Sequence, residues 1–261
     1  MNPRRILYLV VLAIVAIGGG TLLGIRGSRG SFSRPTQIKP GICSLKSGAG
    51  VFVFGAKTNR GVILFDSSAD PAGKPIDAVL GCLGASRPDV REAFLTHAHF
   101  DHVSGAASLP PTVKTHLGAG DAELAARNVS PDGIAPKLLT LVMRPPAVRV
   151  TDPLTGSQTF DVGDGKAVKA VPIPGHTPGS FAFLYDGVLF VGDIAIAHDG
   201  KLDPTPSAFD PHPDENRASI RALRTQLAGD RIETVCTGHG GCTPLGFGST
   251  ALDDLASRVG S

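Results

Sequence analysis

The chain of 261 residues contains no tryptophan and only two tyrosines, whereas glycine and proline are abundant, with 33 and 21 residues. This composition predicts many tight turns and modest aromatic packing. The formal net charge is only +2, which implies no strongly charged partner. No cluster of lysines and arginines interleaves with aromatic residues, as a nucleic-acid groove would require, so the sequence argues against nucleic acid as a partner.

The G-x-S-x-G motif of serine hydrolases is also missing, so a catalytic serine triad has no support in the sequence. Cysteine is scarce, and the four cysteines are Cys43, Cys82, Cys236 and Cys242. Cys236 and Cys242 flank His239, so they could be metal ligands, could form a disulfide if the domain is exported, or could stay buried thiols. The sequence alone leaves these three states open.

One long apolar run is present at residues 6–25, preceded by Arg4 and Arg5 and followed by Arg26. Its twenty residues, at about 1.5 Å each, would just cross the apolar core of a bilayer. We therefore expect residues 1–26 to be a transmembrane anchor or signal segment, and the lack of an A-x-A cleavage site favours an anchor. Residues 27–40 are rich in Ser, Gly, Arg and Pro and are expected to be a flexible linker.

This interpretation predicts a membrane-attached protein whose main domain, residues 41–261, is extracytoplasmic and therefore periplasmic. The domain would be secreted if the N-terminal segment is cleaved. The arginines on both sides of the apolar run compete under the positive-inside rule, so the sequence does not decide the orientation. The oligomeric state is equally open.

Three imidazoles and a carboxylate occur within six residues, in the stretch Thr96-His97-Ala98-His99-Phe100-Asp101-His102. The stretch follows an apolar run, so His97 and His99 can point the same way at the end of a buried strand. Asp101 and His102 then fall at the start of a short helix. Such clustering of histidine and aspartate predicts a site for zinc or a similar transition metal.

Three further candidate ligands each follow another apolar strand. His176 lies in the Pro- and Gly-rich loop 172–179, Asp193 follows the strand expected at 187–192, and His239 follows the strand expected at 232–236. Functional side chains concentrate on loops that a rigid sheet positions. We therefore expect these residues to share one site with the first cluster.

With this pattern the chain resembles the metallo-β-lactamase superfamily, specifically its glyoxalase II-like hydrolases, over residues 41–261. The resemblance implies an α/β (α+β) fold, a four-layer αββα sandwich, here preceded by one N-terminal membrane helix. It also implies two zinc ions, the first bound by His97, His99 and His176, the second by Asp101, His102 and His239. Asp193 would bridge the two ions, and Asp66, at the end of the strand 63–66, would be a structural hydrogen-bonding residue.

The function implied by the resemblance is hydrolysis of a small ester, thioester, lactone or amide, which includes a β-lactam, by a hydroxide that bridges the metals. Asp101 could also carry a proton. Only 22 residues follow His239, which leaves no room for the glutathione-binding helices of true glyoxalase II. Tyrosine occurs only at Tyr8 and Tyr185, which weakens the analogy with lactonases. Substrate-binding residues cannot be assigned.

Two alternative functions remain at this point. The first is a mononuclear iron dioxygenase that acts on persulfides, with iron bound mainly by His97, His99 and Asp193. The second is an inactive, membrane-tethered binding protein, although the intact set of candidate ligands argues against it. Metal analysis would separate iron from zinc.

Overall fold

The computed structural model describes residues 32–48 and 50–260. The predicted N-terminal anchor or signal segment at residues 1–26 lies outside the described residues. None of the described helices is long and apolar enough to cross a membrane.

Two β-sheets form the centre of the described part of the chain. The first has seven strands in the spatial order β1 (Thr36–Lys39), β2 (Ile42–Lys46), β3 (Phe52–Thr58), β4 (Gly61–Phe65), β5 (Val90–Phe94), β6 (Lys114–Gly118) and β7 (Asp152–Leu154). The second has six in the order β15 (Gly241–Cys242), β14 (Thr234–Thr237), β11 (Val188–Phe190), β10 (Phe181–Tyr185), β9 (Lys166–Pro172) and β8 (Gln158–Gly163). A separate hairpin contains β12 (Ala195–His198) and β13 (Lys201–Pro204).

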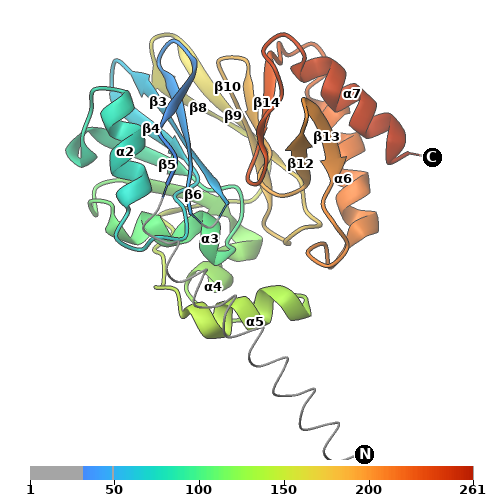
Figure 1. Cartoon of the computed structure of the whole chain (residues 1–261), viewed down its shortest axis with the longest axis horizontal. Helices are drawn as coiled ribbons and strands as arrows, with labels where there is room; N and C mark the ends of the chain where they lie inside the picture. The colour runs from blue at the N-terminus through green and yellow to red at the C-terminus, as the bar shows by residue number, and fades with distance from the viewer. Residues whose placement is uncertain (1–31, 49, 261) are drawn as a thin grey trace, which may run out of the picture.

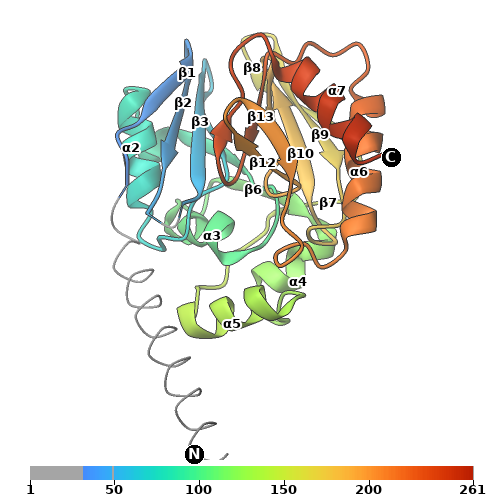
Figure 2. The same cartoon turned by 45° about the vertical axis from the view of Figure 1, so that its right-hand side comes forward.

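Helices cover both outer faces of the two sheets (Figure 1). The helix α2 (Lys74–Cys82) packs on the first sheet, and α6 (Pro213–Gln226) and α7 (Gly248–Arg258) pack on the second. Three short helices, α3 (Phe100–Val103), α4 (Ala122–Ala125) and α5 (Ile134–Met143), lie at one end of the sheets (Figure 2). The expected four-layer αββα sandwich is therefore present.

Phenylalanine fills the layer between the two sheets. The ring of Phe65 stacks on that of Phe190 with the centroids 3.9 Å apart, and Phe94 and Phe183 pack in the same cluster. All four side chains are buried, and burial of each stabilises the fold by about 1.5–3 kcal/mol. The absence of tryptophan thus does not weaken this central layer, because alternate residues of both sheets supply phenylalanine to it.

The first strand begins earlier than the sequence predicted. Residues Thr36–Lys39, which we expected in the flexible linker 27–40, form β1 and pair antiparallel with β2. The two strands are joined through Gly41, whose φ of 80° suits a tight turn. The Pro-Gly pair that looked like the end of a linker is therefore the turn of a hairpin, and the linker cannot extend beyond residue 35.

Two disulfides link the four cysteines. One joins Cys43 on β2 to Cys82 at the end of α2, across 39 residues of sequence. The other joins Cys236 to Cys242, which are partners in the β14–β15 pair. No free cysteine is present among the described residues, so the alternatives of a cysteine ligand and of buried free thiols are both wrong.

Candidate metal centre

Three histidines from two loops converge on one point. His97 and His99 lie in the loop between β5 and α3, and His176 lies in the loop between β9 and β10. Nδ1 of His99 is 3.1 Å from Nε2 of His97 and 3.0 Å from Nε2 of His176. The single lone pair of Nδ1 cannot serve both contacts as good hydrogen bonds. Tetrahedral zinc bonds of about 2.0–2.1 Å would place neighbouring ligand nitrogens about 3.3 Å apart, which is close to the observed spacing.

A second group of side chains lies beside the first. Asp101 and His102 come from α3, and His239 comes from the turn between β14 and β15. Oδ2 of Asp101 is 3.4 Å from Nε2 of His239. The ligand atoms of these three residues all lie within 4.8 Å of one another, so they could hold one metal ion.

Asp193 lies between the two groups, in the turn that connects β11 to β12. Its Oδ2 is 4.0 Å from Nε2 of His97 and 3.8 Å from Nε2 of His176. The same oxygen is 3.3 Å from Nε2 of His102 and 3.4 Å from Nε2 of His239. One carboxylate oxygen therefore faces two histidines of each group.

The protonation states suit metal binding. Burial lowers the pKa of His176 to about 3 and lowers those of His97 and His99, so all three imidazoles are neutral at neutral pH. Burial tends to raise the pKa of Asp101, but its hydrogen bond with His239 and the charge of His102 lower it to about 2. Metal ligation requires neutral imidazoles and ionised carboxylates, and these four side chains already provide them.

The other two histidines lie in the field of the carboxylates. Burial tends to lower the pKa of His239, but the charge of Asp193 and the hydrogen bond with Asp101 raise it to about 10. Burial likewise opposes protonation of His102, but the charges of Asp193 and Asp66 raise its pKa well above the usual value. A cation is thus favoured beside these carboxylates, and a metal ion would take the place of the protons.

Two buried polar atoms support the same conclusion. Oδ1 of Asp193 has no hydrogen-bond partner among the described residues, and Nε2 of His102, although 3.3 Å from Oδ2 of Asp193, makes no well-aligned hydrogen bond. A buried polar atom without a partner costs about 1–3 kcal/mol, so native proteins rarely leave one. Histidine nitrogen and carboxylate oxygen are common zinc ligands, and the residues present therefore fit a metal centre.

Asp66 holds His102 in its orientation. The residue follows β4, and its Oδ2 lies 2.8 Å from Nδ1 of His102. Its other oxygen, Oδ1, accepts a hydrogen bond of 2.8 Å from the backbone N–H of Thr96. The sequence prediction that Asp66 is a structural hydrogen-bonding residue is confirmed, and its contact with a candidate ligand gives it a positioning role as well.

Asp121 ties together the two loops that carry the three-histidine group. This buried residue accepts hydrogen bonds from the backbone N–H of Ala98 and of Gly179, both 2.8 Å long. It also accepts one of 2.7 Å from the hydroxyl of Thr177. Ala98 lies between His97 and His99, and Thr177 follows His176, so Asp121 determines how the loops approach each other. The sequence analysis assigned no role to Asp121.

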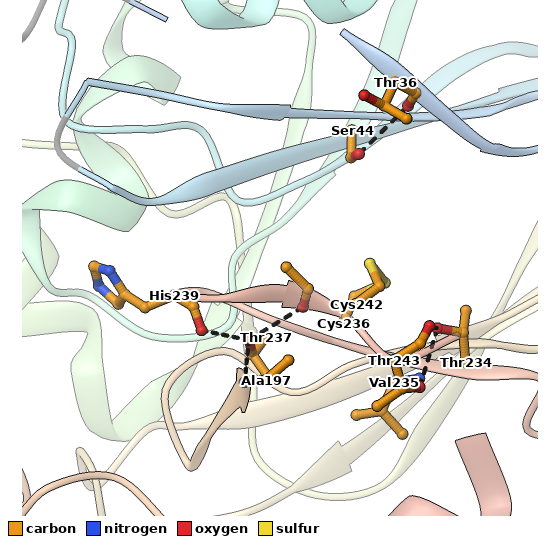
Figure 3. The surroundings of a disulfide bond; sticks show 11 residues. Thr36, Ser44, Ala197, Thr234, Val235, Cys236, Thr237, His239, Cys242 and Thr243 are labelled. Carbon is orange, nitrogen blue, oxygen red and sulfur yellow. Dashed lines mark hydrogen bonds between the residues drawn. A yellow bond between two sulfur atoms is a disulfide. The ribbon is translucent and has the colours of Figure 1, made fainter. Parts of the chain in front are cut away.

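The turn that carries His239 is braced on both sides (Figure 3). The hydroxyl of Thr237 donates to the carbonyl of His239 at 2.6 Å and accepts from the N–H of Ala197 at 3.1 Å. The disulfide between Cys236 and Cys242 closes the two strands behind the turn, and the imidazole of His239 points away from it. At Gly238 a Cβ atom would collide with Oδ1 of Asp193, so only glycine fits.

A cavity of about 410 Å³ opens above the two groups. Its floor contains five of the candidate ligands, and its walls are mainly apolar. The residues that line it are Gly48, His99, Phe100, Asp101, Pro136, Leu139, Thr140, His176, Asp193, Ile196, Thr205, Pro206, Phe209 and His239. Its volume lies within the range of about 300–1,000 Å³ that is typical of small-molecule sites.

The remaining histidines in the described part of the chain are not part of this centre. His116 is buried between the carboxylates of Glu92 and Asp152, at 2.7 and 2.8 Å. His198 is exposed beside Asp199, and His212 lies 3.5 Å from Asp132. None of the three lines the cavity.

The structure thus brings together all seven side chains that the sequence nominated as ligands, and their coordination of metal remains a prediction. It also identifies the residues of the cavity wall, which sequence reasoning missed. The apolar stretch of α5, between Pro131 and Pro145, was the available signal for one wall.

Two hydroxyacylglutathione hydrolases are similar in sequence to part of this chain. Over 133 residues it is 32% identical to a hydroxyacylglutathione hydrolase of Shewanella sp. (strain ANA-3), a match that covers 50% of this chain and 45% of the relative. A second such hydrolase, of Shewanella oneidensis, is 28% identical over 159 residues, 60% of this chain and 52% of the relative. The chain spans about half the length of the curated relatives it matches.

Solved structures share the fold at low sequence identity. BJP-1, a subclass B3 metallo-β-lactamase of Bradyrhizobium japonicum, superposes with a TM-score of 0.62 at 22% identity, over 88% of this chain and 94% of that one. A metallo-β-lactamase from Pontibacter korlensis gives a TM-score of 0.65 at 17% identity, over 88% of this chain and 100% of that one. The model of the metallo-β-lactamase superfamily matches residues 49–239. This match confirms the resemblance seen in the sequence, and the chain belongs to the metallo-β-lactamase superfamily.

Proposed function

We propose that this chain is a metal-dependent hydrolase with two zinc ions, which cleaves a small ester, thioester, lactone or amide. The observation that carries the proposal is the position of Asp193. Its Oδ2 lies 3.3–4.0 Å from ring nitrogens of His97, His102, His176 and His239. A carboxylate between two sets of nitrogen ligands suits two ions about 3.5–4 Å apart. The hydrolase names of the sequence relatives support the same reaction class.

Two zinc ions bound here would supply a Lewis acid for a carbonyl oxygen and would lower the pKa of water towards about 7. The protein residues supply the geometry. Asp66 and Asp121 orient the candidate ligands through the hydrogen bonds described above. The side chains of His176 and Asp193 at the floor are largely shielded from solvent, which strengthens the electrostatic interactions there.

The hydrolysis step adds the oxygen of water to the carbonyl carbon. The bond from that carbon to oxygen, sulfur or nitrogen then breaks, and its electron pair stays with the leaving group. A proton from the water ends on the leaving group, so atoms and charges balance. The carboxylate of Asp101 lines the cavity, and we propose that it carries this proton in addition to binding metal.

Metal content and hydrolysis measured on the same preparation test the proposal. We expect about two zinc ions per chain by elemental analysis and cleavage of simple esters or thioesters that a chelator abolishes. His99→Ala should lose metal and activity, whereas His198→Ala, which changes an exposed histidine outside the centre, should keep both. One iron per chain with no zinc would favour the persulfide dioxygenase instead. Two zinc ions without any hydrolysis would favour an inactive binding protein.

We also propose that the protein works outside the cytoplasm and is attached to the membrane. The apolar run at residues 6–25 supports attachment. The two disulfides support an oxidising compartment, since disulfides are rare in reducing cytosol. Cell fractionation tests the proposal: the full chain should sediment with membranes, and deletion of residues 1–25 should release active protein. Full-length protein found wholly in the soluble fraction would contradict it.

A further inference from the structure

The cavity above the candidate metal centre has two different ends. Its floor is formed by His99, Asp101, His176, Asp193 and His239, and every charged or titratable side chain among the lining residues lies there. The rest of the wall comes from α5, from α3 and from the segment around β12 and β13. Gly48 completes it, and its large apolar side chains are those of Phe100, Leu139, Ile196 and Phe209.

No lysine or arginine is among the described residues that line this cavity. The basic residues nearest in sequence to the wall of α5, Lys137 and Arg144, line a second hollow with Arg127, and this hollow shares only Thr140 with the cavity. The hydroxyl of Thr205 donates to the backbone carbonyl of Asp193. The wall therefore offers large apolar surfaces and very few polar groups to a ligand.

We propose that the substrate of this site carries an uncharged, apolar group, an alkyl or aryl chain, in the part that extends from the scissile carbonyl into the cavity. The inference rests on the proposed hydrolase function and narrows its substrate class. Phe100, Leu139, Ile196 and Phe209 would contact this group. A substrate with a carboxylate at the same place is disfavoured.

The physical reason is the difference in desolvation between the two kinds of group. Each methylene that leaves water for an apolar wall gains free energy equivalent to about a fourfold change in an equilibrium or rate constant. A carboxylate at the same position loses its hydration and meets no cation on the wall. The positive charges of bound metal ions would lie at the floor, at the other end of the cavity.

Ester series of increasing chain length test the inference. We use 4-nitrophenyl esters from acetate to octanoate and a parallel series of alkyl acetates from ethyl to octyl, with the zinc-loaded protein. In at least one series kcat/KM should rise about threefold to fourfold per added methylene until the cavity is full. Mono-4-nitrophenyl adipate, in which a carboxylate replaces the terminal methyl group of the hexanoate ester, should react at least about tenfold more slowly than that ester.

Two matched pairs of variants connect the preference to the wall. Phe209→Ala should reduce kcat/KM for the octanoate ester about fivefold more than it reduces kcat/KM for the acetate ester, because the lost contact is apolar and the longer chain makes more of it. Phe247→Ala changes a similarly exposed phenylalanine outside the cavity, 59% exposed compared with 46% for Phe209, and should change neither. Leu139→Ala and the outward-facing Leu138→Ala form the second pair, on one helix.

The outcomes separate the two proposals. If the protein binds two zinc ions and cleaves none of these esters or the corresponding thioesters, the proposed hydrolase function fails. If it cleaves them but kcat/KM does not change with chain length in either series, the hydrolase function stands and the inferred substrate class is wrong. The same conclusion follows if kcat/KM for the adipate ester equals that for the hexanoate ester. The same holds if Phe209→Ala and Phe247→Ala have equal effects on the octanoate ester.

Discussion

Oδ2 of Asp66 lies 2.8 Å from Nδ1 of His102, and both side chains are buried. A carboxylate that accepts a hydrogen bond from one ring nitrogen directs the other nitrogen, here Nε2, towards Asp193 and the candidate metal centre. The same carboxylate accepts hydrogen bonds from the N–H and hydroxyl of Thr96, the residue before His97. Asp66 thus links the orientation of a candidate ligand to the position of the loop that carries two others.

Asp66→Ala should therefore affect both metal binding and folding. Loss of the partner of His102 should weaken metal affinity at its group about 10- to 100-fold. The unpaired donors of Thr96 should lower the free energy of unfolding by about 1–3 kcal/mol. Chelator competition and chemical denaturation measure the two effects.

The chain offers a close control for Asp66→Ala. Asp199 is exposed, and its φ of 48° resembles the φ of 55° at Asp66. Alanine at either position therefore meets a similar backbone strain. Asp199→Ala should leave metal affinity unchanged, and equal losses of affinity in both variants would contradict the positioning role of Asp66.

Asp193→Ala tests the carboxylate between the two groups. If Asp193 bridges two metal ions as proposed, removal of this side chain takes a ligand from both groups and leaves less negative charge between the cations. We expect bound zinc to fall from about two ions to one or fewer and hydrolysis to fall by orders of magnitude. Asp193→Asn keeps the shape but not the charge and should also fail to hold two ions. Two retained ions with full turnover would end the bridging assignment and the mechanism that depends on it.

Asp121→Ala should disturb the three-histidine group without touching a ligand. The change leaves the N–H groups of Ala98 and Gly179 and the hydroxyl of Thr177 without their acceptor. We expect a loss of about 3 kcal/mol in the free energy of unfolding and weaker binding of one metal ion. Thermal melts with and without added zinc provide the measurement. Asp161→Ala, at an exposed aspartate that pairs with Arg60, is the control and should leave the free energy of unfolding nearly unchanged.

The convergence of the seven nominated side chains was predictable because each lies just after an apolar strand or in the helix that follows one. Strand ends at one edge of a sheet bring distant residues together, and this relation is visible in sequence as an apolar run followed by His or Asp. Asp66 could be assigned for the same reason, because it ends the strand β4.

Other features could not be read from sequence. Ile134, Leu138 and Leu141 on α5 are exposed, so the helix lacks the polar outer face that reveals an amphipathic helix. The cavity wall forms because α5 lies near the segment after β13, about 60 residues later in the chain. No local sequence pattern predicts this contact. The Cys43–Cys82 pair is similarly non-local, since 39 residues separate its members.

The last prediction concerns the Cys236–Cys242 disulfide, which closes the strands on both sides of His239. His239 is the one candidate ligand supplied by the second sheet's β14–β15 turn, so its position depends on how rigidly that turn is held. Replacement of both cysteines by serine should weaken metal binding at the group of Asp101, His102 and His239, and activity should become more sensitive to chelator.

The double variant Cys43→Ser/Cys82→Ser is the matched control, because it removes a disulfide between β2 and α2, elements that carry no candidate ligand. Both double variants should have a lower free energy of unfolding. The loss should be about 2–4 kcal/mol for Cys43→Ser/Cys82→Ser, because that disulfide closes the larger loop. Only the Cys236→Ser/Cys242→Ser variant should need a higher zinc concentration for half-maximal activity. A parallel loss of zinc affinity in both would show that the effect is general destabilisation and that the disulfide does not position His239.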